Sequence, residues 1–364
     1  MPHASGSRSR LTGTPPMTDI GTKRPGYSHQ SRWLTPGLLP LRILLAVVYG
    51  LVTTLRNRLY DWRILPVKRV PAVVISVGNL SVGGSGKTLL VEALARKLTD
   101  AGLGVGIVSR GYGRTTRGIQ VVSDGKEVLL DAASAGDEPF LLAANLPGVP
   151  IMVGADKRAV SAAMIERFGV AVILLDDGFQ HRRLYRDLDV VILNRLPENL
   201  GHLLPWGNLR ESRRGLQRAD MIFYAKLPEH EASHLSESEI LRFAVNDTLR
   251  GVEPPGLAVG ALAGKKIGAF CGLGQPGHFF RTLEQAGITP VVAFTFPDHC
   301  AYNASDRERI THAGMDGWIT TQKDFVKLPP DFAAGQNIYY LPVQVMLHPE
   351  KWAEILTWVK AARG

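Results

Sequence analysis

A glycine-rich string limits the folds open to this chain more than any other segment. It reads Gly83-Gly84-Ser85-Gly86-Lys87-Thr88, and it lies between an apolar run and an amphipathic helical pattern. Glycines let backbone N–H groups turn toward phosphates, the lysine reaches the β- and γ-phosphates, and the threonine hydroxyl is a ligand for Mg²⁺. The pattern therefore predicts a nucleotide phosphate loop made of Ser81, Val82, Gly83, Gly84, Ser85, Gly86, Lys87 and Thr88, although Ser81 stands where such loops usually have glycine.

Two adjacent carboxylates, Asp176 and Asp177, directly follow the apolar run from Ala171 to Leu175. A phosphate loop needs an acidic metal partner at a strand end, and Mg²⁺ prefers a few oxygen ligands plus water. A lone aspartate here would more often cap a turn, but the pair after a buried-type strand favours a metal role. Gln180 and His181 follow closely, and we expect them and the next two arginines to face the same site; for the two arginines, a basic surface is an equally good interpretation.

A second acidic pair, Asp137 and Glu138, precedes Pro139, which is typical of a helix N-terminus. His299 lies in a Phe-Pro-Asp-His-Cys string and is by itself more typical of a structural histidine. Spacing alone leaves both groups without an assigned chemical role.

Apolar runs alternate with helical patterns from Pro71 onward, which predicts an α/β fold with a parallel sheet flanked by helices. A Gly/Pro-rich stretch at 251–262 predicts a boundary, followed by a smaller C-terminal α/β unit. We expect a phosphate-loop core at 66–250 and the C-terminal unit at 251–364. The expected strands are 72–77, 105–108, 151–153, 171–175, 189–193 and 221–224 in the core and 266–271, 291–295 and 318–321 beyond it, with helices that include 87–99 and 158–167.

Composition narrows the class of protein and its partners. The chain has 364 residues, enough for about two domains. Two cysteines are too few for a disulfide scaffold or a thiolate zinc site. With 42 basic and 33 acidic residues the formal charge is +9, which favours anionic partners without saying which.

The N-terminal part divides into two segments. Residues 1–32 are rich in Ser, Gly, Pro and Arg, which predicts disorder. Residues 33–65 contain an uncharged stretch, shorter than the roughly 20 residues that span a bilayer, flanked by aromatic residues and arginines. We expect a helix in the membrane interface; a buried core helix is the alternative.

Eight strings taken together resemble the tetraacyldisaccharide 4′-kinase family, which acts in lipid A biosynthesis. The resemblance runs from about Trp33 to the C-terminus, and the DDGFQHRRL string is its most specific part. The strings are VGNLSVGGSGKT, SRGYGR, GDEP, LLDDGFQHRRLYRDLD, LLPWGNLRES, GLGQPGHF, FPDH and TTQKD.

The resemblance implies a membrane-associated kinase with a phosphate loop, which phosphorylates the 4′-hydroxyl of an anionic, lipid-embedded tetraacyldisaccharide 1-phosphate with ATP and Mg²⁺. It implies a place at the cytoplasmic face of the bacterial inner membrane, peripheral or monotopic. Nucleic acid and an obligate protein partner are not expected. It also accounts for Ser81, because the family's loop has Ser or Thr there.

Site roles also follow from the resemblance. Asp137 and His299 would form the acid/base pair, with Lys87 acting on the phosphates. The metal would be held by Thr88, Glu138, Asp176 and Asp177, while Gln180, His181, Arg210 and Glu211 match family positions near the cleft.

Departures and alternatives remain. Trp206, Asn208 and Ser212 differ from the family's usual Leu-Pro-Ala-Gly-Pro-Leu-Arg-Glu-Pro run, and Gln322 replaces its usual Glu. The alternative function is a GTPase acting as a switch or metal chaperone, which predicts an Asn-Lys-x-Asp string. The nearest string, Thr321-Gln322-Lys323-Asp324, has another order.

Overall fold

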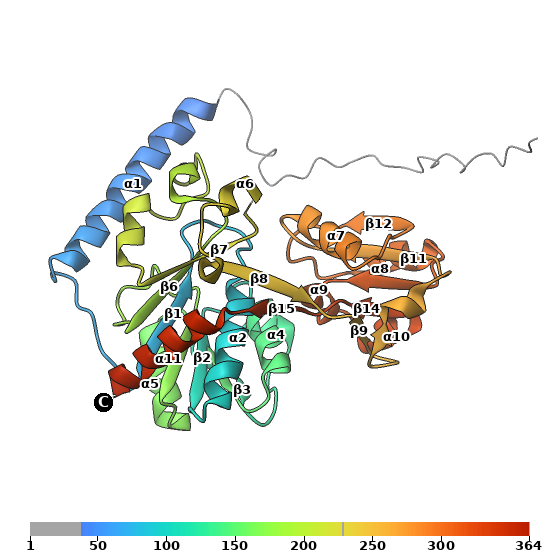
Figure 1. Cartoon of the computed structure of the whole chain (residues 1–364), viewed down its shortest axis with the longest axis horizontal. Helices are drawn as coiled ribbons and strands as arrows, with labels where there is room; N and C mark the ends of the chain where they lie inside the picture. The colour runs from blue at the N-terminus through green and yellow to red at the C-terminus, as the bar shows by residue number, and fades with distance from the viewer. Residues whose placement is uncertain (1–37, 228, 364) are drawn as a thin grey trace, which may run out of the picture.

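The computed structural model describes residues 38–227 and 229–363, which form two sheets flanked by helices (Figure 1). The predicted disorder at 1–32 and the aromatic anchor Trp33 lie outside the described residues. The larger sheet has nine strands in the order β15-β8-β7-β6-β1-β5-β2-β4-β3, and the smaller has six in the order β10-β9-β14-β13-β11-β12. This is the predicted α/β architecture with a second, smaller sheet.

The core strands of the larger sheet are short apolar runs that are buried on both faces, as expected of parallel strands covered by helices. They are β1 (Val73–Gly78), β2 (Val105–Ser109), β4 (Pro150–Val153), β5 (Val172–Asp176), β6 (Leu188–Leu193) and β7 (Met221–Ala225). The sequence predicted each of these strands to within two residues at either end.

Further strands were not predicted, because they are edge or connecting strands with mixed polarity. β3 (Gln120–Asp124) pairs antiparallel with β4 at one edge, and β8 (Ile240–Val245) pairs with β7 and β15 (Val343–Met346). In the smaller sheet, β9 (Thr248–Gly251), β10 (Leu257–Ala258) and β14 (Ile338–Tyr340) were likewise not predicted. The predictions at 266–271, 291–295 and 318–321 are confirmed by β11 (Ile267–Cys271), β12 (Val292–Thr295) and β13 (Gly317–Thr320).

Helices α2 (Lys87–Asp100) and α5 (Lys157–Phe168) were predicted. The buried residues of α2, such as Leu90, Leu94 and Leu98, recur every four positions and pack on the sheet. The other helices are α3 (Ala132–Ala135), α4 (Asp137–Asn145), α6 (Glu229–Ala232), α7 (Pro276–Gln285), α8 (Ala304–His312), α9 (Gln322–Phe325), α10 (Pro330–Gly335) and α11 (Pro349–Arg363).

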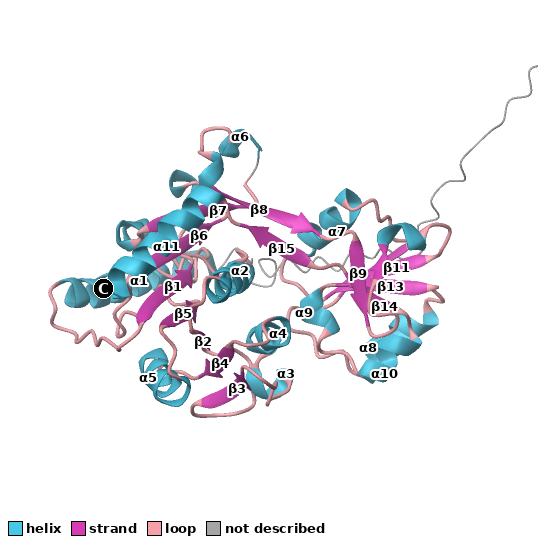
Figure 2. Cartoon of the chain, turned by 60° about the horizontal axis from the view of Figure 1, so that its bottom comes forward, coloured by secondary structure: helices cyan, strands magenta, loops and turns pink. Residues whose placement is uncertain are grey.

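The chain returns to the larger sheet after the smaller one. β15 joins β8 at the sheet's edge (Figure 2). Helix α11 contributes Ile355 and Val359 to the same hydrophobic core as β1 and β2. The division at about residue 250 stays a prediction, but residues 343–363 pack with the first unit. We therefore propose a C-terminal unit of about 248–341 rather than one that extends to residue 364.

Helix α1 (Leu39–Asp61) lies along the outside of the larger unit. It has 23 residues, and its most apolar 18-residue window has a mean hydropathy of 1.6 and is only 11% buried. It is thus longer than the uncharged stretch that predicted it, and the buried core helix proposed as an alternative is wrong. By length and composition it is also the one helix among the described residues that is long enough to cross a membrane.

Candidate active site

The phosphate loop joins β1 to α2 at the carboxyl edge of the larger sheet. Gly83 and Gly86 have φ of 124° and 87°, conformations that side chains rarely adopt. The loop is held from both sides: Val82 N donates to Asn208 O at 2.8 Å, and Asn79 Nδ2 donates to the buried Ser85 hydroxyl at 3.2 Å. The loop is therefore preorganised, and β1 lies between β5 and β6, whose carboxyl ends meet the same edge.

Lys87 and Asp177 meet at this edge, as the sequence predicted for a phosphate loop and its acidic partner. Lys87 Nζ lies 3.6 Å from Asp177 Oδ1, and Arg210 Nη1 donates to Asp177 Oδ2 at 2.6 Å. Burial raises the pKa of Asp177, but the two cations lower it more, so the net shift is downward. Thr88, the next residue of α2, lies in the same helical turn as Lys87.

Asp176 ends β5 and is 1% exposed. Ser109 Oγ donates to its Oδ2 at 3.0 Å, whereas its Oδ1 is buried with no hydrogen-bond partner. Burial, reinforced by the nearby Glu138, raises the pKa of Asp176 to about 6. Glu138 thus lies close enough to act on Asp176, so Glu138, Asp176 and Asp177, three of the four predicted metal-site residues, are neighbours.

Lys157 was missed by the sequence analysis, because a single lysine after a strand carries no motif. Lys157 is the first residue of α5 and is 4% exposed. Its Nζ donates to the carbonyl oxygen of Asp176 and, at 2.8 Å, to that of Asp177. Burial lowers its pKa to about 8 despite the two aspartates. Asp177 has φ of 55°, and the hydrogen bond from Lys157 to its carbonyl oxygen supports this left-handed conformation.

Asp137 and His299 are in contact although 162 residues separate them. Asp137 is the first residue of α4, His299 lies after β12, and His299 Nδ1 is 3.0 Å from Asp137 Oδ2. Burial raises the pKa of Asp137, but the hydrogen bond from His299 and the charge of Lys327 outweigh it and lower the pKa. The two residues thus form a pair across the two units, as the family resemblance implied; their catalytic role stays a prediction.

Gln180 and Glu211 belong to one hydrogen-bond network within the protein. Glu211 is 0% exposed, accepts from Gln180 Nε2 at 3.0 Å and from Arg218 Nη2 at 2.8 Å, and also accepts from Asn57 Nδ2 at 2.9 Å. Its carboxylate therefore ties α1 to the segment that carries Arg210. A positioning role fits this geometry better than contact with a substrate.

His181 is also a supporting residue. Its Nε2 lies 3.6 Å from Asp156 Oδ1, and burial together with the charge of Lys157 lowers its pKa to about 4. The ring is therefore neutral at physiological pH.

The departures from the family pattern have visible contacts. Trp206 stacks on His202 with ring centroids 3.6 Å apart, and Asn208 supports the phosphate loop through its carbonyl. Gln322 forms a reciprocal pair with Asn145: its Nε2 donates to Asn145 Oδ1 at 2.7 Å, and Asn145 Nδ2 donates back at 3.2 Å. Gln322 thus joins α9 to α4, outside the phosphate loop.

The Thr321–Asp324 string, the one nearest to a guanine-binding motif, forms hydrogen bonds within the C-terminal unit. Asp324 is 0% exposed, and its Oδ2 accepts from Gly272 N at 2.9 Å and from Thr321 Oγ1 at 2.7 Å. Its carboxylate is therefore engaged within the protein and does not present itself to a base.

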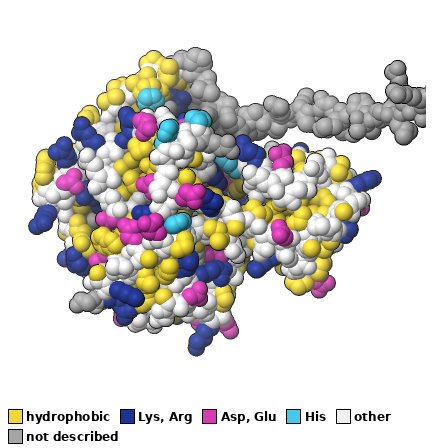
Figure 3. Space-filling view, in the orientation of Figure 1, with side chains coloured by type: hydrophobic (Ala, Val, Ile, Leu, Met, Phe, Trp, Pro, Cys, Tyr) yellow, Lys and Arg dark blue, Asp and Glu magenta, His cyan; other side chains and the backbone are white. Residues whose placement is uncertain are grey.

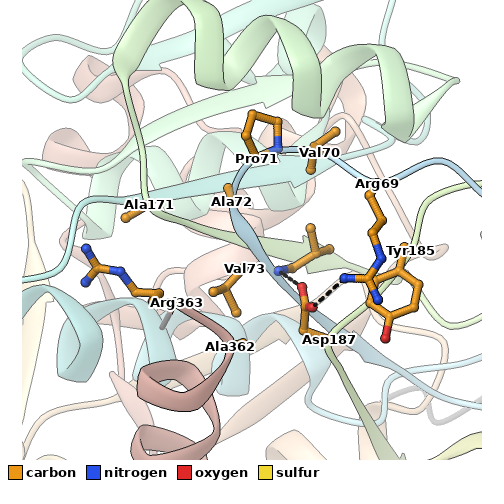
Figure 4. Close-up of a pocket in the computed structure, with 11 residues that line it drawn as sticks. Arg69, Val70, Pro71, Ala72, Val73, Ala171, Tyr185, Asp187, Ala362 and Arg363 are labelled. Atoms are coloured by element: carbon orange, nitrogen blue, oxygen red, sulfur yellow. Dashed lines mark hydrogen bonds and ion pairs between the residues drawn. The ribbon is translucent and has the colours of Figure 1, made fainter.

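A cavity of about 370 Å³ lies at the opposite, amino end of the strands (Figure 4). Arg69, Val73, Ala171 and Tyr185 are among its lining residues, and its Asp187 accepts from Val74 N at 2.8 Å. None of the predicted site residues lines it, so it is separate from the phosphate-loop edge.

Comparison with known proteins agrees with the site. Residues 38–360 match the family described as tetraacyldisaccharide-1-P 4′-kinase. The tetraacyldisaccharide 4′-kinases of Anaeromyxobacter dehalogenans and Syntrophus aciditrophicus are 39% and 35% identical to this chain; the matches cover 80% and 89% of it and 82% and 95% of theirs.

A crystal structure of LpxK from Aquifex aeolicus, in complex with ATP, superimposes with a TM-score of 0.71 at 33% identity. The match covers 89% of this chain and 98% of that one. The fold, the phosphate loop and these matches agree, and the chain belongs to the tetraacyldisaccharide-1-P 4′-kinase family.

Proposed function

We propose that this protein transfers the γ-phosphate of ATP to the 4′-hydroxyl of a tetraacyldisaccharide 1-phosphate, a step of lipid A biosynthesis. The observation that carries the proposal is the contact of Asp137 with His299, because it sets a hydrogen-bonded carboxylate next to Glu138, which in turn acts on Asp176. Family membership supports the kinase over a GTPase switch, and the engaged carboxylate of Asp324 agrees with it.

The reaction needs a base at the acceptor and charge neutralisation at the phosphates. Asp137 takes the proton of the attacking hydroxyl, the hydroxyl oxygen forms a bond to the γ-phosphorus, and the bond from phosphorus to the β–γ bridging oxygen breaks to leave ADP. Lys87 and the N–H groups of the loop stabilise the charge on the phosphates. His299 holds Asp137 in place and stabilises its ionised carboxylate before the proton is transferred.

The residues present fit Mg²⁺. The buried Oδ1 of Asp176 has no hydrogen-bond partner, so a bound cation would compensate its burial. Thr88 and Glu138 offer further oxygen ligands. In the described part of the chain no group of three or more His, Cys, Asp or Glu residues is placed so that it could hold a metal ion by itself. That agrees with Mg²⁺, which keeps several waters and shares its ligands with phosphates. Bound there, Mg²⁺ would neutralise charge on the transferring phosphate.

Helix α1 is the proposed contact with the cytoplasmic surface of the inner membrane. Its inner face is tied to the core, since Tyr49 OH donates to Arg210 O at 2.7 Å. Its outer face is an exposed apolar stripe that includes Leu44, Leu51 and Leu55, and Figure 3 shows yellow side chains at the upper left edge, where Figure 1 places α1. The helix thus joins a lipid-embedded substrate to the segment that carries Arg210.

Phosphate transfer tests the reaction. Labelled γ-phosphate from ATP should appear on a tetraacyldisaccharide 1-phosphate in detergent micelles only when Mg²⁺ is present. If ATP is hydrolysed while the disaccharide stays unlabelled, the proposal of a nucleotide site stands and the proposed acceptor is wrong. The substitutions at Trp206 and Asn208 would then be examined first.

Vesicle binding tests the membrane contact. The triple variant Leu44→Glu/Leu51→Glu/Leu55→Glu should bind vesicles of phosphatidylglycerol at least about tenfold more weakly, because three apolar side chains lose their burial in lipid. Transfer in micelles should persist. Val291→Glu, which changes an equally exposed apolar residue of the other unit, should bind vesicles as the unaltered protein does. Equal binding by all three proteins would reject α1 as the membrane contact.

A further inference from the structure

Lys327 lies against the proposed base but belongs to no motif used above. Its side chain is 7% exposed, and its Nζ lies 3.6 Å from Asp137 Oδ2 and 3.1 Å from Asp324 Oδ1. The ammonium also lies 5.5 Å from the centre of the Tyr302 ring. A buried lysine is costly unless it is paired, so two carboxylates and a ring at these distances define one position for it.

Asp324 is what fixes Lys327. The donors Gly272 N and Thr321 Oγ1 occupy Asp324 Oδ2, so that Oδ1 is left for the lysine. Lys327 also follows Asp324 by three residues, and its backbone N–H donates to Asp324 O at 3.1 Å. The lysine is therefore anchored in the C-terminal unit while its charged end reaches α4 of the larger unit.

The same oxygen of Asp137 receives both groups from the C-terminal unit. His299 Nδ1 lies 3.0 Å from Asp137 Oδ2 and Lys327 Nζ lies 3.6 Å from it, whereas no described donor contacts Asp137 Oδ1. One oxygen is thus held and the other is left for a hydroxyl. Lys323, the other cation near Asp137, is paired with Asp298 at 3.6 Å and is no part of this arrangement.

We propose that Lys327 is a positioning residue for the phosphoryl transfer: it holds Asp137 Oδ2 from the C-terminal unit, so that Asp137 Oδ1 is the oxygen that takes the proton of the acceptor. The inference rests on the proposed role of Asp137. On this proposal the orientation of the base depends on the contact between the two units, because Lys327 reaches Asp137 only when the units are docked as they are in this structure.

Steady-state transfer by the full chain in micelles tests this. Lys327→Met should lower kcat by about 10- to 100-fold, a part of the 10²- to 10⁴-fold that a positioned base supplies. The KM for ATP should change less than about threefold, because the phosphate loop belongs to the other unit. Lys327→Arg, which keeps the charge, should recover at least about a third of the lost kcat. Lys351→Met, which removes a partly exposed lysine of α11 paired with Glu354, should have the kcat of the unaltered protein.

A double variant separates positioning from direct contact. In an Asp137→Asn background, Lys327→Met should lower the residual rate no further, because the lysine acts through Asp137. Should Lys327→Met unfold the protein, Asp324→Asn serves instead, since it removes the carboxylate that anchors the lysine; it should lower kcat at least about threefold.

Three results would overturn the inference: a kcat of Lys327→Met within about twofold of the unaltered protein, no recovery with Lys327→Arg, or equal losses in the presence and absence of Asp137. The proposed function fails differently. If Asp137→Asn alone keeps full activity, the base is wrong; if Asp137→Asn is inactive while Lys327→Met is not, only the role of Lys327 is wrong.

Discussion

The phosphate loop and the Asp137–His299 pair are built in opposite ways. The loop is one continuous segment, Ser81 to Thr88, whose glycines and helix N-terminus prepare it for phosphates without help from the C-terminal unit. The pair exists only because His299, after β12, meets α4 of the larger unit. Binding of ATP and activation of the acceptor should therefore respond differently to the same disturbance of the interface between the units.

The largest effect should come from the loop itself. Lys87→Ala should lower the rate of single-turnover transfer by about 10³-fold and weaken ATP binding, because a charge beside the transferring phosphate is lost. Rapid quench with labelled ATP measures the first and equilibrium dialysis the second. Lys126→Ala, at an exposed turn, is the matched control. Unchanged ATP binding would show that the loop holds the nucleotide without Lys87.

The second-largest effect should come from the Asp137–His299 pair. His299→Ala should lower kcat by about 10²-fold while the KM for ATP stays within about threefold, because the histidine acts on the base and not on the phosphates. The exposed His234 offers a control of the same residue type, as His234→Ala. A KM for ATP that rises in step with the loss of kcat would place His299 in the nucleotide site instead.

The lowered pKa of His181 predicts that the free energy of unfolding depends on pH. Burial and Lys157 lower the pKa of His181 from 6.5 to about 4, so the folded state favours the neutral ring. Between pH 6.5 and pH 4 the unfolded chain therefore binds more protons than the folded protein. The contribution of His181 to the free energy of unfolding is fully present above about pH 6.5 and is lost as the pH falls toward 4. Urea unfolding at pH 7 and pH 5 should differ by of order 2 kcal/mol from this residue. His181→Gln should reduce that difference; an unchanged slope would contradict the assignment.

The smallest effect concerns the contact between the units at the far end of α4. Gln322→Ala removes the reciprocal pair with Asn145 and should lower the free energy of unfolding by about 1 to 2 kcal/mol, the usual value of two neutral hydrogen bonds. Urea unfolding checks this, with Gln285→Ala at an exposed helix end as control. Because Asp137 starts the same helix, kcat should fall only about two- to threefold. A much larger fall would make Gln322 part of the chemistry.

Sequence reasoning found what is local. Buried parallel strands read as continuous apolar runs, and the phosphate loop and Asp176–Asp177 are contiguous motifs, so each could be predicted from its own neighbours. The pairing of Asp137 with His299 came only from the family resemblance, because contacts over 162 residues leave no local pattern.

The remaining features were missed for the same physical reason. Lys157 and Lys327 are single lysines whose importance comes from the carboxylates and carbonyls that the fold brings to them. β8 and β15 pair with each other although all strands of the smaller sheet lie between them in the sequence. Neither short strand could therefore be assigned without its partner. The return of α11 to the first core likewise depends on that pairing.

A double-variant cycle on Asp137 and His299 tests the central claim most directly. Transfer of the γ-phosphate to the tetraacyldisaccharide 1-phosphate would be measured at saturating ATP for Asp137→Asn, His299→Ala and the two combined. Since the histidine acts through the aspartate, the combined variant should be no slower than Asp137→Asn alone. If the two losses instead multiply, the residues work independently, and the base is not a single pair shared by the two units.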